Sequence, residues 1–128
     1  MKLTEQKKKE WEDTLKEIEL MPAADSIQEH TQGDLWEFLA QTRGNYFFTE
    51  TRFIFTGGLL GAYNFSIPYN AITELKLCNV GTLPIIPTGI KVTYTDENGK
   101  VCKKKCSVLK RKEWLAYLTE RTSVVTAN

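Results

Sequence analysis

The sequence contains few histidines and cysteines, the residues that most often bind zinc. Its single histidine is His30, and its three cysteines are Cys78, Cys102 and Cys106. If Cys102 and Cys106 lie on one strand, they are about 13 Å apart, whereas a disulfide keeps its Cα atoms within about 7 Å. A zinc site needs a closer cysteine pair and more histidine. We therefore expect free, buried cysteines, no metal and no cofactor.

The sequence also lacks a strong net charge and a long apolar run. Its formal net charge is only +1, so no overall field attracts a nucleic acid. No apolar run approaches the length of a membrane-spanning helix, and no apolar segment follows the first charged residues as in a secretory signal. Together with the odd number of cysteines, these features predict a cytoplasmic protein that does not bind nucleic acid.

Known catalytic motifs are absent as well. The sequence has no Walker A loop, no Gly-x-Ser-x-Gly and no His-Glu-x-x-His. The glycines at positions 57, 58 and 61 neither follow a parallel strand nor open a helix, so they indicate a hairpin and not a phosphate-binding loop. Nothing near His30 completes a catalytic triad. The sequence therefore predicts that the protein is not an enzyme.

What the sequence does contain is a series of short apolar runs typical of antiparallel strands. Two aromatic runs, at 46–48 and 53–55, flank a stretch short enough for a tight hairpin turn. A glycine-rich reversal at 57–61 leads to a third run at 63–69, so the three runs predict a meander. Later segments are expected to be strands at 72–78, 88–95 and 100–108, a turn at 96–99, and an apolar loop at 79–87 whose two prolines disfavour a central strand.

A helix is expected at residues 4–20, with Thr4 as its cap and Pro22 ending it. Its apolar stripe consists of Trp11, Leu15 and Ile18. A stripe this narrow is typical of a helix that docks on a neighbouring surface.

The aromatic hairpin lacks the alternation of a sheet with one wet face. Phe47 and Ile54 point to the side opposite their aromatic neighbours in the two runs, so both sides of the hairpin are apolar. We therefore expect its outer side to be covered, either by the N-terminal helix or by another subunit. The sequence leaves open whether that helix packs in cis or in trans.

The sequence predicts the secondary structure of one segment next to the expected sheet but not of the other. Residues 23–42 stay undecided, because 26–31 fits a first strand while 34–41 fits a short helix or a strand extension. Residues 110–122 predict a closing helix, and its apolar face carries Trp114, Leu115 and Leu118. Six or seven short strands followed by one helix are typical of a small antiparallel barrel or sandwich with a plugged end.

In this order the segments resemble a known family. A glycine precedes an apolar strand ending in threonine at 44–49, Arg-apolar-x-Phe follows at 52–55, and Phe-Ser-Ile-Pro-Tyr-x-x-Ile spans 65–72. A late hairpin and a helix bearing Glu113 and Trp114 complete the pattern. The pattern resembles the bacterial pleckstrin-homology-like domains and the related GRAM domains.

The resemblance implies a mainly β fold, a barrel of two near-orthogonal antiparallel sheets with about seven strands, capped by the C-terminal helix with Trp114 as the plug. The implied division is a helical extension at 1–22, the domain at 23–122 and a frayed tail at 123–128. Family members are interaction modules and not enzymes. Many eukaryotic relatives bind phosphoinositides through a basic loop after the first strand, where this chain offers only Arg43.

Two groups of residues are candidates for binding. The candidate interface for self-association or a protein partner consists of Phe47, Ile54, Leu59, Leu60, Trp11, Leu15 and Ile18. The candidate contact for an anionic membrane consists of Arg43, Lys103, Lys105, Lys110 and Arg111. Strand alternation places Lys103 and Lys105 on one face and Lys104 on the other, although lysines also protect edge strands from aggregation.

The sequence therefore predicts a non-catalytic module that self-associates or binds a protein partner. The alternative is a peripheral membrane module, which binds anionic lipid through the basic strand and the apolar tips at 59–60 and 83–86. A carrier of small molecules is disfavoured, because the many aromatic side chains fill the interior that such a ligand needs.

Overall fold

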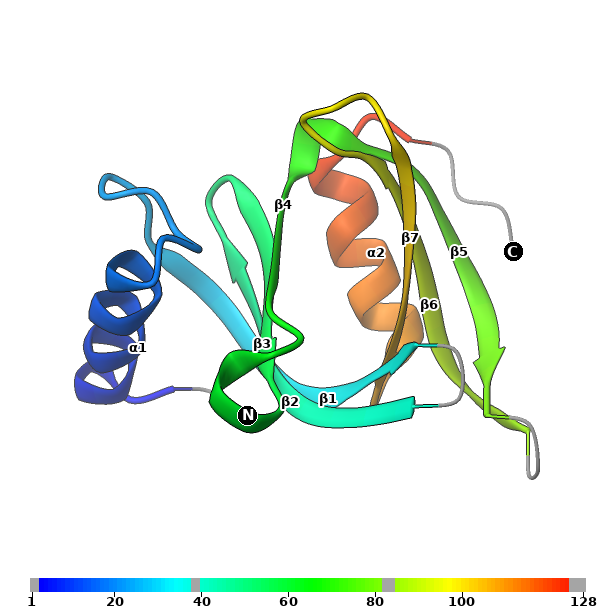
Figure 1. Cartoon of the computed structure of the whole chain (residues 1–128), viewed down its shortest axis with the longest axis horizontal. Helices are drawn as coiled ribbons and strands as arrows, with labels where there is room; N and C mark the ends of the chain where they lie inside the picture. The colour runs from blue at the N-terminus through cyan, green and yellow to red at the C-terminus, as the bar shows by residue number, and fades with distance from the viewer. Residues whose placement is uncertain (1–2, 38–39, 82–84, 125–128) are drawn as a thin grey trace.

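The computed structural model describes residues 3–37, 40–81 and 85–124, which form seven antiparallel strands and two α-helices (Figure 1). The strands are β1 (Ile27–Glu37), β2 (Ala40–Thr49), β3 (Arg52–Gly57), β4 (Phe65–Pro68), β5 (Ile72–Val80), β6 (Ile86–Thr95) and β7 (Val101–Val108). The helices are α1 (Glu5–Glu17), α2 (Arg111–Arg121) and the short 3-10 helices η1 (Leu59–Gly61) and η2 (Tyr69–Ala71). The expected mainly β chain with a helix near each end is confirmed.

The strands are hydrogen-bonded in one series, in the order β4-β3-β2-β1-β7-β6-β5. The expected meander is present, and within it β2 pairs with β3 from Gly44 opposite Gly57 to Phe48 opposite Phe53. A second meander, β5 to β7, joins the first where residues 33–36 of β1 pair with β7. Because β4 and β5 are both edges, the sheet is not closed. The described strands thus form one continuous sheet, and a division into two sheets is not seen.

One face of the sheet carries the main hydrophobic core, and α2 lies against this face. Leu115 and Leu118 of α2 are buried in the core. The Trp114 ring stacks on Phe48, with centroids 4.5 Å apart and an interplanar angle of 4°. The apolar face predicted for the closing helix is therefore confirmed. The aromatic residues buried in this core are Tyr46, Phe48, Phe53, Phe55, Phe65 and Tyr69.

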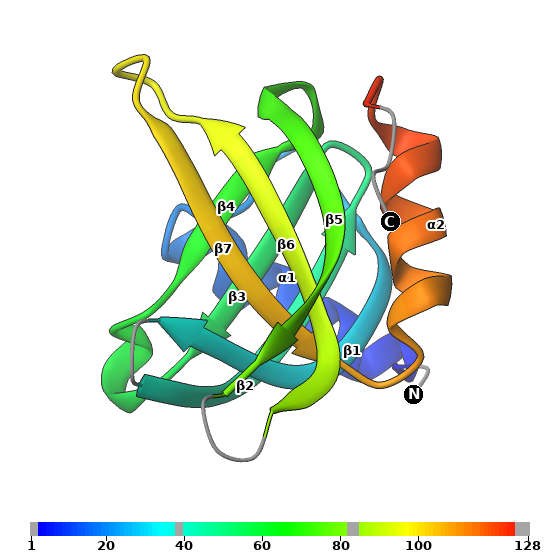
Figure 2. The same ribbon diagram turned by 90° about the vertical axis from the view of Figure 1, so that its right-hand side faces the viewer.

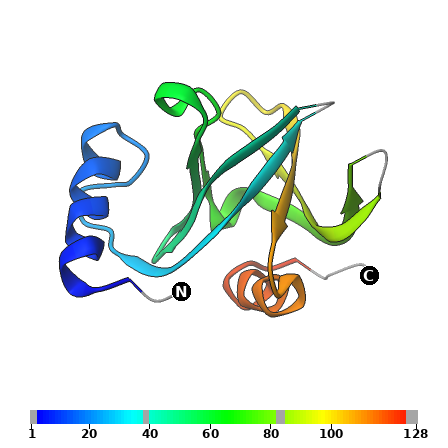
Figure 3. The ribbon, with the colours of Figure 1, turned by 90° about the horizontal axis from the view of Figure 1, so that it is seen from below.

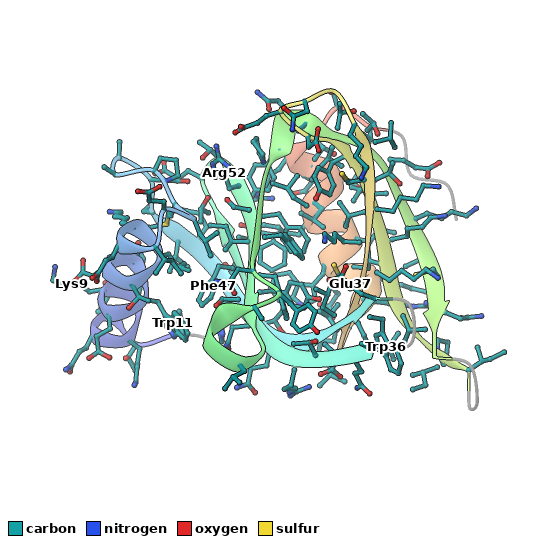
Figure 4. All side chains as sticks on the ribbon, viewed as in Figure 1. Lys9, Trp11, Trp36, Glu37, Phe47 and Arg52 are labelled. Carbon is teal, nitrogen blue, oxygen red and sulfur yellow. The ribbon has the colours of Figure 1, made fainter. Side chains whose placement is uncertain are left out.

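The opposite face of the first meander is covered by α1, which lies far from α2 (Figures 1 and 3). Phe47 and Ile54 are buried there with Leu15 of α1 in a second, smaller cluster. The Trp11 ring packs on Phe47, with centroids 4.8 Å apart (Figure 4). Of the two covers that the sequence allows, the structure therefore has the helix of the same chain.

The first helix begins as predicted and ends earlier than predicted. The Thr4 hydroxyl accepts a hydrogen bond from the Lys7 amide at 3.1 Å, so Thr4 is the cap. The helix ends at Glu17 and does not continue to Pro22. The reason is a reversal of the backbone at Glu19, whose φ of 64° lies in the left-handed region.

Two segments between the predicted strands are more extended than the sequence indicates. Residues 23–42, whose secondary structure the sequence left undecided, include the whole of β1 and the start of β2. These residues are strands because β1 pairs with both β2 and β7, and local periodicity does not reveal such pairing. The expected loop at 79–87 is shorter, because β6 already includes Pro87. A register shift between Cys78 and Val80 lies opposite this proline, and an irregular ladder tolerates a missing N–H.

Candidate functional site

The outer face of β5, β6 and β7 carries a row of lysines, and Figure 2 views these strands from that side. Lys76 lies opposite Lys91, and Lys91 lies opposite Lys105. Each of the three has at least one sequence neighbour buried in the core, namely Leu75, Val92 or Cys106, so the lysines point away from it. Adjacent strands are about 4.8 Å apart, which places the three side chains side by side. With Lys103, exposed on the same side of β7, we call these four residues the basic face.

The charge of the basic face is not balanced by neighbouring acids. Like charges directly opposite each other destabilise a sheet. Among the described residues, none of the four lysines forms a salt bridge. The next row contains one carboxylate, Glu74, separated from Lys103 by Thr93. We therefore expect the lysines in register to make the sheet less stable than neutral residues at these positions would.

Arg111 extends the basic face at one end. It stands at the start of α2, and its Nη1 donates to the carbonyl oxygens of Cys78 at 2.8 Å and Gly89 at 3.4 Å. Burial raises the pKa of the Cys78 thiol, while Lys105, Lys91 and Arg111 oppose that rise. The hydrogen bonds of Arg111 to Cys78 and Gly89, which lie opposite each other two residues beyond Lys76 and Lys91, place its guanidinium at the end of the lysine row.

Gly89 makes this corner of the sheet compact. A Cβ at this position would lie 2.7 Å from the Cys78 sulfur. The missing side chain therefore leaves room for the Cys78 side chain opposite it.

The residues predicted to contact anionic lipid do not all lie on this surface. Lys103 and Lys105 are exposed on the basic face, as alternation predicted. Lys110 is exposed in the turn before α2. Arg43 is on β2 and forms a salt bridge with Asp34, with Nη1 and Oδ1 3.5 Å apart. Of the predicted set, Lys103 and Lys105 therefore lie on the basic face and Arg111 lies at its end, whereas Arg43 lies on β2 in the other meander.

Lys104 points to the other face of the sheet, as predicted. Its Nζ lies 3.5 Å from a carboxylate oxygen of Glu37 and 5.7 Å from the centroid of the Phe65 ring. The sequence did not identify Lys76 and Lys91 as part of a basic surface, because each is a single lysine on a different strand. Only the register of the strands brings them into line with Lys105.

The predicted interface is largely buried within the chain. Leu15 of α1 and the sheet residues Phe47 and Ile54 beneath it are completely buried, so they offer no free surface. Ile18 is 46% exposed at the end of α1, and Leu59 is 84% exposed in η1. The side chain of Leu60 and residues 82–84 lie outside the described part of the chain.

The exposed apolar tip and the basic face lie on different parts of the sheet. The tip at η1 joins β3 to β4 in the first meander, whereas the lysines lie on the second meander (Figures 1 and 2). The structure therefore does not bring the tip at 59–60 to the basic face, whereas Ile85 of the second tip is 63% exposed just before β6, in the same meander as the lysines.

His30 and the three cysteines were the residues considered for metal binding or catalysis. His30 is buried beside Phe47, and its Nε2 lies 2.9 Å from the Asn45 side-chain oxygen. All three cysteines are free. In the part of the chain that the structure describes, no group of three or more potential ligands is placed to hold a metal. The helices of that part are too short or too polar to cross a membrane.

Comparisons with known proteins bear on the fold. No family model and no curated protein sequence matches the chain. The C-terminal domain of an unknown protein from Leishmania infantum is 17% identical, and the match covers 88% of this chain and 94% of that chain with a TM-score of 0.63. The hSac2 domain from human phosphoinositide phosphatase Sac2 is 8% identical, with 98% and 92% covered and a TM-score of 0.60. At these identities, the chain shares the fold of these two domains.

Proposed function

We propose that the chain is a non-catalytic interaction module with a pleckstrin-homology-like arrangement. The order of its elements supports this assignment: a first meander, a second meander, and a C-terminal helix packed on the core. In this arrangement the two meanders correspond to the two near-orthogonal sheets of a barrel.

The surface that we propose to bind is the basic face, and its partner is an anionic membrane surface. The observation that carries this proposal is the row of Lys76, Lys91 and Lys105 across three strands, without salt-bridge partners among the described residues. Each basic residue near an anionic membrane contributes about 1 kcal/mol. Four lysines then contribute about 4 kcal/mol, enough for weak and salt-sensitive attachment.

A membrane suits this surface better than a nucleic acid does. The lysines form a patch three strands wide, which complements a broad array of headgroups. The net charge of +1 gives no long-range attraction to a polyanion. One structure of similar fold belongs to a phosphoinositide phosphatase, and that name supports a lipid surface as the partner.

Vesicle sedimentation tests the proposal. The purified chain is mixed at low salt with phosphatidylcholine vesicles that either contain or lack phosphatidylserine. The test variant carries Lys91→Glu and Lys105→Glu, and the matched control carries Lys7→Glu and Lys9→Glu on α1. We expect the wild type and the control to sediment with anionic vesicles only, and the test variant to stay in solution. High salt should release the bound protein, because it screens exposed charges.

Three outcomes would refute the proposal. The first is no sedimentation of the wild type at low salt. The second is an equal loss of binding in the test and control variants, which would mean that charge matters and its position does not. The third is tight binding of a single-stranded oligonucleotide that competes with the vesicles, which would make a nucleic acid the better partner.

A further inference from the structure

Two exposed apolar side chains lie at one end of the second meander. Ile85, just before β6, is 63% exposed, and Leu109, just after β7, is 79% exposed. The last residues that pair at this end of the β6–β7 ladder are Gly89 and Ser107. Ile85 precedes Gly89 in the sequence and Leu109 follows Ser107, so both lie beyond the same end of the two strands. We call Ile85 and Leu109 the apolar pair.

Leu109 points to the same side of the sheet as the basic face. Along β7, Cys106 and Val108 are buried in the core, whereas Lys103 and Lys105 are exposed on the opposite side. Leu109 follows Val108, and alternation directs it away from the core, in agreement with its high exposure. An apolar side chain therefore adjoins the lysines on the surface that we propose to bind anionic lipid.

The two ends of the second meander differ in charge. Figure 2 shows the turn between β6 and β7 at one end and the start of α2 at the opposite end. Residues 96–100 carry two carboxylates and one lysine, whereas residues 110–113 carry three cations and one carboxylate. The Lys100 amide donates to Asp96 at 2.9 Å, and this hydrogen bond lowers the pKa of Asp96. An anionic membrane therefore attracts the end next to α2 more strongly than it attracts the turn.

The surface beside Leu109 presents no unbalanced carboxylate among its described residues. Leu109 borders a hollow lined by residues of β1, β2, β6 and β7, and the acidic residue of that lining is Asp34. Asp34 forms a salt bridge with Arg43, with Oδ1 and Nη1 3.5 Å apart. It also accepts a hydrogen bond from the Gln41 side chain at 2.9 Å. An anionic headgroup next to Leu109 thus meets a carboxylate that is already paired.

From these observations we propose that the chain attaches to the membrane with the end of the second meander that carries the apolar pair. Ile85 and Leu109 insert between the lipid headgroups, and the basic face binds the anionic headgroups around them. The turn at 96–99 points toward the solution. Attachment of this kind combines burial of apolar surface with attraction to anionic lipid. The inference rests on the proposed function and adds the orientation and the inserted residues.

Serine substitutions test the insertion without changing the charge. The test variant carries Ile85→Ser and Leu109→Ser, and the matched control carries Leu59→Ser and Val101→Ser. Leu59 is 84% exposed on the first meander, and Val101 is 61% exposed at the other end of β7. Sedimentation with phosphatidylserine vesicles over a range of lipid concentrations measures the affinity. The test variant should bind at least about tenfold more weakly, because the buried apolar area is lost. The control should bind like the wild type.

A fluorescent label reports the orientation directly. Leu109→Cys and Val101→Cys are made separately in a background with Cys78→Ser and Cys102→Ser, and each is labelled with a nitrobenzoxadiazole group. The remaining Cys106 is 1% exposed, so it is protected from the label. The emission of this group moves to shorter wavelengths in apolar surroundings. Vesicles that contain phosphatidylserine should cause this shift at position 109 and not at position 101.

The outcomes distinguish failure of this inference from failure of the proposed function. The inference alone fails if the wild type sediments, the variant with Lys91→Glu and Lys105→Glu does not, and the serine test variant binds like the wild type. It is also overturned if the test and control variants lose affinity equally. A label at position 109 whose emission stays unchanged, or a label at position 101 that shifts as much, would overturn it as well. A wild type that does not sediment would overturn both.

Discussion

Asp25 connects the linker after α1 to the turn between β2 and β3. Asp25 as a whole residue is 4% exposed. It accepts hydrogen bonds from the hydroxyls of Thr49 and Thr51 at 2.6 and 2.7 Å and from the amides of Ser26 and Glu50 at 2.9 and 3.0 Å. Burial alone would raise the pKa of Asp25, but these hydrogen bonds to the charged form outweigh it and lower the pKa. Three of the four partners are distant in sequence, so the sequence did not reveal this role.

Asp25→Asn should destabilise the protein by about 2 kcal/mol at pH 7, because a charged acceptor of several hydrogen bonds is lost. The pKa of Asp25 is lower in the folded state than the unfolded value of about 4. Its contribution to stability is therefore complete above that value and is lost as the pH falls through the folded pKa. The difference in urea midpoint between wild type and Asp25→Asn should shrink from pH 7 toward pH 2. The exposed substitution Glu97→Gln is the control, and a difference that stays constant with pH would contradict this account.

At the scale of the element, local signals located the start of α1 but not its end. Thr4 is a capping residue by type, and the stripe of Trp11 and Leu15 has helical spacing, so both are visible in the sequence. The end depends on Glu19 in a left-handed conformation, and only a glycine there would have signalled it. In the same way, the apolar runs indicated strands but not their partners, because pairing is a long-range property.

Leu15→Asp should detach α1 and leave the sheet folded. Leu15 is completely buried, so an unpaired charge at this position opposes docking. A free helix of 13 residues is marginal in water, so α1 should then unfold. Hydrogen exchange should show loss of protection at residues 5–17 and unchanged protection in β6. The control Lys9→Asp, at an exposed position of the same helix, should keep α1 protected. Loss of protection in β6 as well would mean that α1 is part of the main cooperative unit.

At the scale of the whole molecule, the sequence predicted the order of the elements but not how the two meanders join. They join through the pairing of β1 with β7, where Gly33 lies opposite Val108. A Cβ on Gly33 would lie 2.4 Å from the Ser107 carbonyl oxygen, so a glycine is required for this approach. No local pattern identifies that glycine as a joint. The same limit applies to the basic face, because its lysines belong to three strands whose alignment only the register determines.

The repulsion within the lysine row leads to a trade-off between stability and binding. Lys91 is the middle lysine and has a like charge on both sides. Lys91→Gln should therefore stabilise the chain by about 0.5 kcal/mol at low salt. The same change should weaken binding to anionic vesicles about fivefold, the equivalent of about 1 kcal/mol. Thermal unfolding and vesicle sedimentation of the same sample measure both effects.

Measurements at high salt distinguish charge repulsion at Lys91 from an effect of its side-chain packing. High salt screens the repulsion, so the gain in stability of Lys91→Gln should disappear there. Lys112→Gln makes the same change of charge at an exposed position on α2, outside the register of the three lysines, and should not give the salt-dependent gain in stability. A variant that is destabilised, or whose gain persists in high salt, would mean that Lys91 is retained for packing. If the gain depends on salt, the fold keeps a row of charges without which it would be more stable, and a parallel loss of vesicle binding by the same variant would support the proposed role of the row.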